Sequence, residues 1–137
     1  MKLSSASVVI RPDVPVIFLR TRDVAEQIRR AWARLEELVG TRGRKFYGAL
    51  DPPTGEYWVC VQAKKGDDPA ELGLESGTLP GGRYLRARLK GEQSAIYERI
   101  APTFNALETL VNLDPTRPEI EFYRAGDEID VLVPVLD

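Results

Sequence analysis

Apolar residues recur at the spacing of one helix face in two separate segments of the chain. In the first segment the apolar positions are Ile28, Trp32, Leu35, Leu38 and Val39. This pattern predicts an amphipathic helix over residues 23–39, and Gly40 is well placed to end it. Asp23 and Glu26 resemble a capping box at its start, with Asp in the position of Ser or Thr.

The second segment repeats the pattern and predicts a helix over residues 94–112. Its apolar positions are Ile100, Phe104, Leu107, Leu110 and Val111. Pro102 lies inside this segment. Because proline removes a backbone donor and clashes with the preceding turn, we expect Pro102 to kink this helix or break it in two.

The two segments match each other at a constant offset of 72 residues. Over 39 aligned pairs, residues 25–63 on 97–135, nine are identical. The matches continue beyond the helices into the strands that follow, for example Val59 with Val131. Helical periodicity alone would not keep this register through a turn and two strands, so we interpret the match as an internal repeat.

Each half is expected to contain a strand, a helix and two further strands. The predicted strands are 14–20, 44–50 and 56–64 in the first half and 82–90, 118–123 and 128–135 in the second. A Gly- and Pro-rich segment between the halves is expected to be irregular. The pattern predicts one α+β domain over 1–137, a duplicated βαββ unit with repeat one at 8–66, a linker at 67–80 and repeat two at 81–137.

Composition restricts the function mainly through what is absent. The net charge is −2 at pH 7, which gives no bulk field to attract nucleic acid or anionic lipid. The chain contains no histidine and one cysteine, which excludes Ser-His-Asp and Cys-His pairs, zinc sites of His or Cys, and a histidine ligand for haem. We therefore expect no metal and no cofactor.

The location is expected to be cytoplasmic. No apolar run is long enough for a transmembrane helix, and the N-terminal residues lack the apolar stretch of a signal peptide. The lone Cys60 makes no intrachain disulfide, which suits a reducing compartment, and we interpret it as a small apolar strand residue.

Three motifs, in this order, resemble those of one protein family. They are KFYGALDPPTGEYWVCVQ at 45–62, TLPGGRYLRARLKG at 78–91 and PEIEFYRAGDEIDVLVPV at 118–135. On a duplicated βαββ chain they resemble the gyrase-inhibitor-like (GyrI-like) superfamily of bacterial effector-binding domains. That group includes stand-alone proteins and the ligand-sensing domains of AraC-type and MerR-type multidrug regulators.

The resemblance implies a curved antiparallel sheet with two helices on one face, its concave side, and a ligand pocket between the pseudo-two-fold repeats. It also implies that Glu121 lies in an otherwise apolar pocket and meets the positive charge of a ligand. Tyr123 shares a strand face with Glu121 because side chains alternate along a strand. By the offset of 72, the counterpart of Glu121 in the first half is Ala49, so only one half supplies a carboxylate.

Aromatic residues are the other candidates for the walls of such a pocket. Tyr47 and Trp58 lie on predicted strands, and Trp32 and Phe104 occupy equivalent points of the two helices. The helical spacing of Trp32 and Phe104 is also that of ordinary core residues. Trp58 is expected to point away from the face that carries Val59, but the face that meets the pocket depends on the strand register and stays open.

The leading hypothesis is a stand-alone binding protein that sequesters or senses cationic, aromatic, amphipathic small molecules. It predicts a monomer or weak homodimer that binds no nucleic acid directly and no membrane. The alternative is an enzyme, a hydrolase of cyclopropane-bearing DNA-alkylating compounds, in which Glu121 and Tyr123 polarise the substrate and position water. A third hypothesis, a protein partner such as an inhibitor of DNA gyrase, finds no acidic run or apolar patch to support it.

One strand carries a row of positive charges. Arg86, Arg88 and Lys90 alternate with apolar residues over 85–90. Such a row would suit a phosphate track. A half-buried strand with a solvated outer face explains the same alternation, and we favour that interpretation because the whole chain is slightly acidic.

Overall fold

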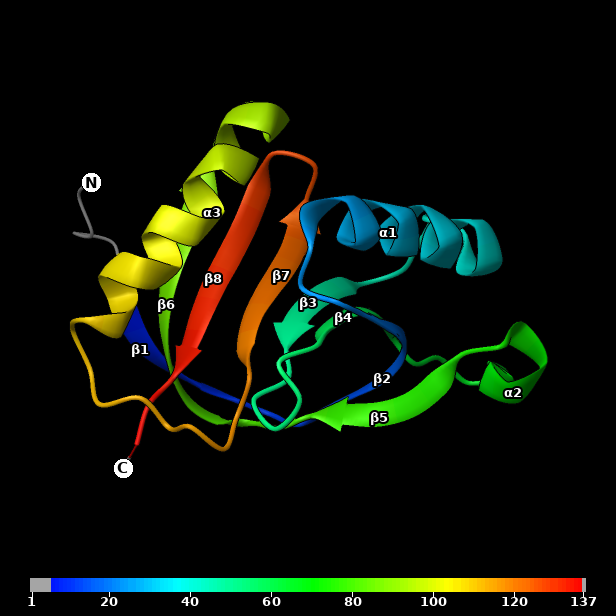
Figure 1. The fold of residues 1–137 in the computed structure, drawn as a ribbon, viewed down its shortest axis with the longest axis horizontal. Coiled ribbons are helices and arrows are strands. Elements are labelled where there is room, and N and C mark those ends of the chain that lie inside the picture. Colours follow the sequence, from blue (N-terminus) through cyan, green and yellow to red (C-terminus); the bar gives the residue numbers. More distant parts are fainter. Residues whose placement is uncertain (1–5, 137) are drawn as a thin grey trace.

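A computed structural model describes residues 6–136, which form an α+β fold (Figure 1). The elements in chain order are β1 Ser7–Arg11, β2 Val14–Thr21, α1 Ala25–Val39, β3 Phe46–Leu50, β4 Tyr57–Gln62, α2 Pro69–Leu72, β5 Glu75–Leu79, β6 Gly82–Lys90, α3 Gln93–Glu108, β7 Glu119–Ala125 and β8 Glu128–Pro134. The predicted fold class is confirmed, and most predicted strands are correct to within two residues.

All strands join one antiparallel sheet in the order β1-β6-β8-β7-β3-β4-β2-β5. The order is symmetric about its centre: counting inward from the two ends, β1 corresponds to β5, β6 to β2, β8 to β4 and β7 to β3. The hairpins β3–β4 and β7–β8 meet at the centre, where Gly48 lies opposite Glu121. The centre of the sheet is therefore the place where the two repeats meet.

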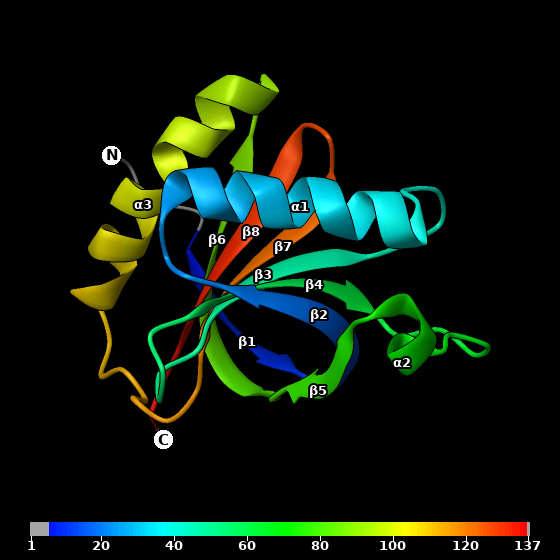
Figure 2. The same cartoon turned by 45° about the vertical axis from the view of Figure 1, so that its right-hand side comes forward.

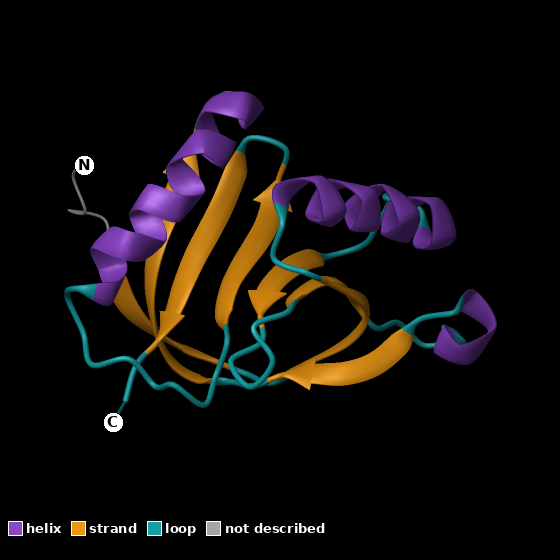
Figure 3. Cartoon of the chain, viewed as in Figure 1, coloured by secondary structure: helices purple, strands orange, loops and turns teal. Residues whose placement is uncertain are grey.

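Each half contains one more strand than the sequence predicted. The segment 67–80, expected to be irregular, contains the short helix α2 and the strand β5 (Figure 3). β1 and β5 are exchanged between the halves: β1 pairs with β6 of the second half, and β5 pairs with β2 of the first. The register is the same in both, since Ser7 lies opposite Arg86 and Glu75 lies opposite Phe18. Short edge strands carry a weak apolar alternation, which is why the sequence pattern missed them.

Both long helices lie on one side of the sheet (Figures 1 and 2). α1 packs on β2 and β4, and α3 packs on β6 and β8. The predicted apolar face of α1 is confirmed, with Leu35 fully buried at its centre. Strands β3 and β7 lie between the two helices, so side chains on this face of the central strands are not directly beneath either one.

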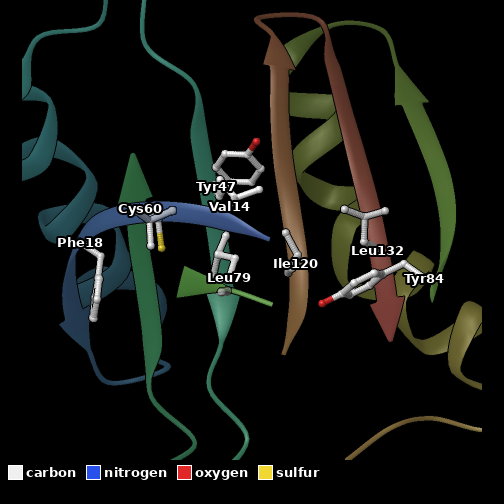
Figure 4. Packing of buried hydrophobic residues seen from close by; sticks show 10 residues of the cluster. Val14, Phe18, Tyr47, Cys60, Leu79, Tyr84, Ile120 and Leu132 are labelled. Atoms are coloured by element: carbon white, nitrogen blue, oxygen red, sulfur yellow. The ribbon is translucent and has the colours of Figure 1, made fainter. Parts of the chain in front are cut away.

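The opposite face buries its side chains without any helix. Val14, Tyr47, Leu79, Tyr84 and Leu132 gather there with other strand residues (Figure 4). These residues come from strands across the whole sheet, so the sheet must curl around them. The helices therefore lie on the outer face of the curl, and the expected placement on the concave side is wrong.

The ends of the helices differ in part from the prediction. Asp23 does not cap α1: Val24 is the N-cap residue and no side chain caps it. Gly40 ends α1 at a φ of 73°, as predicted. The expected break at Pro102 does not occur, since α3 runs through this exposed proline to Glu108. Within residues 6–136, no helix has both the length and the apolar run needed to cross a bilayer.

One arginine, Arg117, connects several segments of the chain by hydrogen bonds. Arg117 donates hydrogen bonds to the carbonyl oxygens of Gly81, Arg83 and Val135 and to the carboxylate of Asp114. Its guanidinium also lies over the ring of Tyr84, 4.9 Å from the ring centre. Gly82, at a φ of 119°, leaves the room that Arg117 needs, since a Cβ there would lie 2.7 Å from its Nη1.

Replacing Arg117 by Ala is therefore expected to destabilise the fold without touching the helices. Three carbonyl groups would lose a charged donor, and a loss of about 2 kcal/mol in the free energy of unfolding is expected. Urea denaturation of the variant measures this loss, with Arg42→Ala in an exposed turn as the control. Equal stability of the two variants would show that Arg117 does not anchor the 113–118 loop.

Candidate functional site

A glutamate between two tyrosines occupies the centre of the helix-bearing face. The Glu121 Oε1 accepts a hydrogen bond from the Tyr57 hydroxyl at 2.7 Å and a second from the Tyr123 hydroxyl. Glu121 and Tyr123 lie on β7, and Tyr57 comes from β4, two strands away. The expected common face of Glu121 and Tyr123 is confirmed. Glu121 stays partly exposed, whereas Tyr57 is buried.

Gly48 makes this arrangement possible. It lies on β3 between the other two strands, directly opposite Glu121. A Cβ at this position would lie 1.9 Å from the Tyr57 Oη and 2.8 Å from the Glu121 Oε1. Any side chain on residue 48 would therefore block the path of Tyr57 to the carboxylate. The φ of Gly48 is not positive, so its backbone conformation does not require glycine. Glycine is needed here because it lets the two side chains approach closely.

The carboxylate lacks a positive partner. Among the ion pairs of residues 6–136, none involves Glu121. Burial raises the pKa of Glu121, hydrogen bonds from Tyr123 and Tyr57 oppose the rise, and the nearby Asp23 carboxylate adds to it. The charged group that acts on Glu121 is therefore another carboxylate, Asp23, and not a cation.

The two tyrosines act as hydrogen-bond donors. Burial, followed by the Glu121 carboxylate, raises the pKa of Tyr57 and of Tyr123 well above the usual value. Both hydroxyls therefore keep their protons at neutral pH and orient the carboxylate. We refer to Tyr57, Glu121 and Tyr123, with Gly48 beneath them, as the Glu121 site.

A further carboxyl lies on the same face of β7. Glu119 is two residues before Glu121, and side chains alternate along the strand. Burial and the neighbouring Glu108 carboxyl at the end of α3 raise the pKa of Glu119 to about 8. The centre of the helix-bearing face is therefore rich in carboxyl groups that hold protons more tightly than usual.

Trp32 extends from α1 to the Glu121 site. Its ring lies edge-on to Tyr123, with ring centres 5.2 Å apart, and also contacts Phe46 at 6.1 Å. Phe104 packs beneath α3 in the same apolar cluster as Tyr123. The structure thus brings Glu121, Tyr123 and Trp32 together, with Phe104 at the side of the second helix.

Tyr47 and Trp58 lie on the opposite face of the sheet from Glu121. Tyr47 stacks on Phe122 at 4.7 Å, and Trp58 stacks on Phe18 at 4.0 Å. Trp58 also lines a shallow cavity of about 120 Å³ on that face. The expectation that Trp58 points away from Val59 is confirmed, but this orientation separates Trp58 from Glu121.

Two residues of the site, Tyr57 and Gly48, and the electrostatic influence of a third residue, Asp23, were not predicted from the sequence. Tyr57 precedes the more conspicuous Trp58, yet it shares a strand face with Val59, which would have placed it under the helices. Gly48 lies opposite Glu121 on the neighbouring strand, a pairing that the sequence did not predict, while Ala49, the counterpart of Glu121 by the sequence offset, faces the helix-free core. Asp23, interpreted as a helix cap, instead affects the pKa of Glu121.

The Glu121 site places a carboxyl group with a raised pKa beside aromatic rings. Such a carboxylate interacts with a cation more strongly than one in bulk water does, because fewer water molecules screen it. Aromatic rings add cation–π and stacking contacts. Residues 6–136 contain no cluster of His, Cys, Asp and Glu that would hold a metal ion.

Comparisons with known proteins show the fold. No protein-family profile matches the chain, and no curated protein matches it. An integron cassette protein of Vibrio cholerae is similar with a TM-score of 0.75 and 13% identity, over 96% of this chain and 95% of that one. The protein SAV2435 bound to tetraphenylphosphonium is similar with a TM-score of 0.68 and 14% identity, over 99% and 94%. A hydrolase from Listeria innocua is similar with a TM-score of 0.54 and 12% identity, over 96% and 91%.

Proposed function

We propose that this chain binds lipophilic cations at the Glu121 site, as a relative of the GyrI-like effector-binding domains. One observation carries the proposal: the carboxylate of the half-buried Glu121 is fixed by two tyrosine hydroxyls and has no positive partner among residues 6–136. A cation would supply the missing counter-charge. The bound tetraphenylphosphonium of the structural neighbour SAV2435 supports this class of ligand.

The ligand is expected to enter between α1 and α3, above β3 and β7. Trp32 now fills part of this space, since its ring contacts Tyr123 and Phe46. A bulky cation would shift the Trp32 ring and stack against it. Aromatic contacts tolerate ligands of different shape, so several unrelated lipophilic cations should bind with micromolar affinity, roughly −8 kcal/mol.

A charge-reversed pair of ligands tests the proposal. Tetraphenylphosphonium and tetraphenylborate have the same shape and opposite charge, so binding of the cation alone would show that charge decides. The two tryptophans are Trp32 and Trp58, and a Trp58→Phe background leaves Trp32 as the single reporter. A Trp32 fluorescence change with tetraphenylphosphonium and none with tetraphenylborate is expected. Equal binding of both ions would contradict the proposal.

The affinity for the cation is expected to rise with pH. Glu121 has a raised pKa, and the pKa of Glu119 is raised to about 8, so the free protein keeps protons that the cation must displace. Calorimetric titration with tetraphenylphosphonium in buffers of different ionisation enthalpy would detect the released protons. Binding without proton release between about pH 6 and 8 would contradict this coupling.

The same groups make the free protein less stable as the pH rises. A carboxyl whose pKa is raised on folding stabilises the fold fully below its ordinary pKa of 4.5, and this contribution is lost as the pH rises through the folded value, about 8 for Glu119. The melting temperature should fall across this interval, and Glu119→Gln should reduce the fall. An unchanged slope in that variant would exclude Glu119 as a source.

A second candidate function is hydrolysis of strained, cyclopropane-bearing alkylating compounds. The observation in its favour is the geometry of one carboxyl between two tyrosine hydroxyls, with burial raising the pKa of Glu121, because such a carboxyl can exchange a proton with water while Tyr57 and Tyr123 donate to a substrate oxygen. The similar Listeria innocua hydrolase fits this reading. Chromatography of such a compound after incubation with the protein tests it, because intact substrate would leave binding as the function.

A further inference from the structure

A second hollow, of about 440 Å³, is lined by four basic residues. They are Arg86, Arg88 and Lys90 of β6 and Arg99 of α3. The Arg99 Nη1 lies 3.4 Å from the Lys90 carbonyl oxygen, which places the two elements together at this edge of the sheet. We call these four residues the basic groove. β8 separates it from β7, which carries Glu121.

The positive charge of the basic groove is only partly neutralised. Arg88 makes ion pairs with Asp130 at 2.7 Å and Glu128 at 3.3 Å, and Lys90 lies 3.7 Å from Glu128. Arg86 and Arg99 have no ion pair within 4 Å among the residues that the structure describes. The Arg86 Nε is buried without a hydrogen-bond partner in the same part of the chain.

The equivalent place in the other half provides an internal comparison. When β4 is aligned on β8 at the offset of 72, Arg20, opposite Trp58, becomes the counterpart of Arg88, opposite Asp130. The registers of the edge strands then make Glu75 the counterpart of Ser7. In that half Glu75 pairs with Arg20 at 2.8 Å, and Glu56 lies 3.5 Å from the same arginine.

The two arginines have the same number of carboxylate partners, because the basic groove has Asp130 where the other half has Trp58 and Ser7 where the other half has Glu75. Arg86 stands where the other half has the apolar Phe18. The basic groove therefore contains a cation, Arg86, that its counterpart lacks, with no additional carboxylate to neutralise it. A solvated strand face explains the alternation along β6, but not this difference between two equivalent strands.

We propose that the basic groove binds a compact, multiply charged oxyanion such as pyrophosphate or a small phosphate ester. Guanidinium groups match phosphate oxygens with paired hydrogen bonds. Asp130 accepts from the Nε and Nη2 of Arg88, which occupies one edge of that guanidinium and fixes its orientation, so Arg86 and Arg99 are the groups expected to donate pairs of hydrogen bonds to the anion. The four lining residues include no aromatic ring and no aliphatic side chain, so charge decides recognition rather than a base or an acyl chain.

Adding a carboxylate at the position that corresponds to Glu75 tests the proposal most sharply. Ser7→Glu would place a carboxylate opposite Arg86 and near Arg88, the counterpart of the Arg20 that pairs with Glu75, and it is expected to weaken pyrophosphate binding at least tenfold. Thr41→Glu, at an exposed position outside the groove, adds the same charge as a control. Calorimetry at about 20 mM salt keeps electrostatic screening weak.

A second pair of variants guards against a folding defect and a net-charge effect. Arg86→Gln/Arg99→Gln should lose pyrophosphate binding, whereas Arg29→Gln/Arg42→Gln, on α1 and its following turn, should retain it. Equal losses in both pairs, or no binding by the unaltered protein, would overturn the proposal. Binding to phosphatidic acid vesicles without binding to pyrophosphate would overturn it too, by identifying a membrane headgroup. Tetraphenylphosphonium binding should be unchanged in all four variants.

Discussion

Glu121→Gln is expected to lose at least tenfold in affinity for tetraphenylphosphonium, a change of about 1.4 kcal/mol. Glutamine keeps an oxygen that accepts the hydrogen bonds from Tyr57 and Tyr123, so the geometry of the site should survive. Only the negative charge disappears. Because burial raises the pKa of Glu121, removal of its charge should leave the melting temperature unchanged or higher.

Glu36→Gln is the matched control, because it removes the same charge from an exposed position on α1. Its affinity for tetraphenylphosphonium should equal that of the unaltered protein. If both variants lose affinity equally, the cation responds to the net charge of the protein. If neither loses affinity, Glu121 is not the anchor.

Gly48→Ala is expected to damage both the fold and the Glu121 site. The added Cβ would lie 1.9 Å from the Tyr57 Oη, so Tyr57 must move and release Glu121. Overpacking of a buried site typically costs about 1–3 kcal/mol of unfolding free energy. The affinity for tetraphenylphosphonium should also fall, since the Glu121 carboxylate loses one of the two tyrosine hydroxyls that fix its position.

A double-variant cycle separates this effect from a general glycine effect. Gly48→Ala with Tyr57→Phe removes the oxygen that clashes, so part of the lost stability should return. Gly126→Ala is the control, because a Cβ there meets nothing within 4 Å. Additive losses in the cycle would show that Gly48 and Tyr57 do not act together.

The repeats, both long helices and six strands could be predicted because each rests on a strong local pattern. The apolar face of α1 around Leu35 and the alternation along β6 are set by burial on one side of each element. β1 and β5 escaped prediction because each is a short edge strand paired with the other half. Such pairing depends on contacts distant in sequence, which no local pattern records.

The candidate site could be predicted only for residues on one strand. Glu121 and Tyr123 share β7, so alternation alone places them together. The orientation of Trp58 away from Val59 was correct, but which of those two faces meets Glu121 depends on the register of β3 with β7. Tyr57 and Gly48 enter the site through that register, so they could be assigned only once the sheet was known.

The two repeats share one fold but differ in their side-chain chemistry at two places. At the centre, Glu121 lies opposite Gly48, so the Tyr57 hydroxyl can pass over the glycine to the carboxylate. At the edge, Ser7 and Arg86 occupy positions whose counterparts are Glu75 and Phe18. These two places, where the repeats differ, are the two ligand sites that we propose.

A crystal structure with tetraphenylphosphonium tests the central claim most directly. The account predicts density for the cation on the helix-bearing face, beside the Glu121 carboxylate and against Trp32, with Tyr57 and Tyr123 still donating to Glu121. Density on the opposite face, in the cavity beside Trp58, would contradict it.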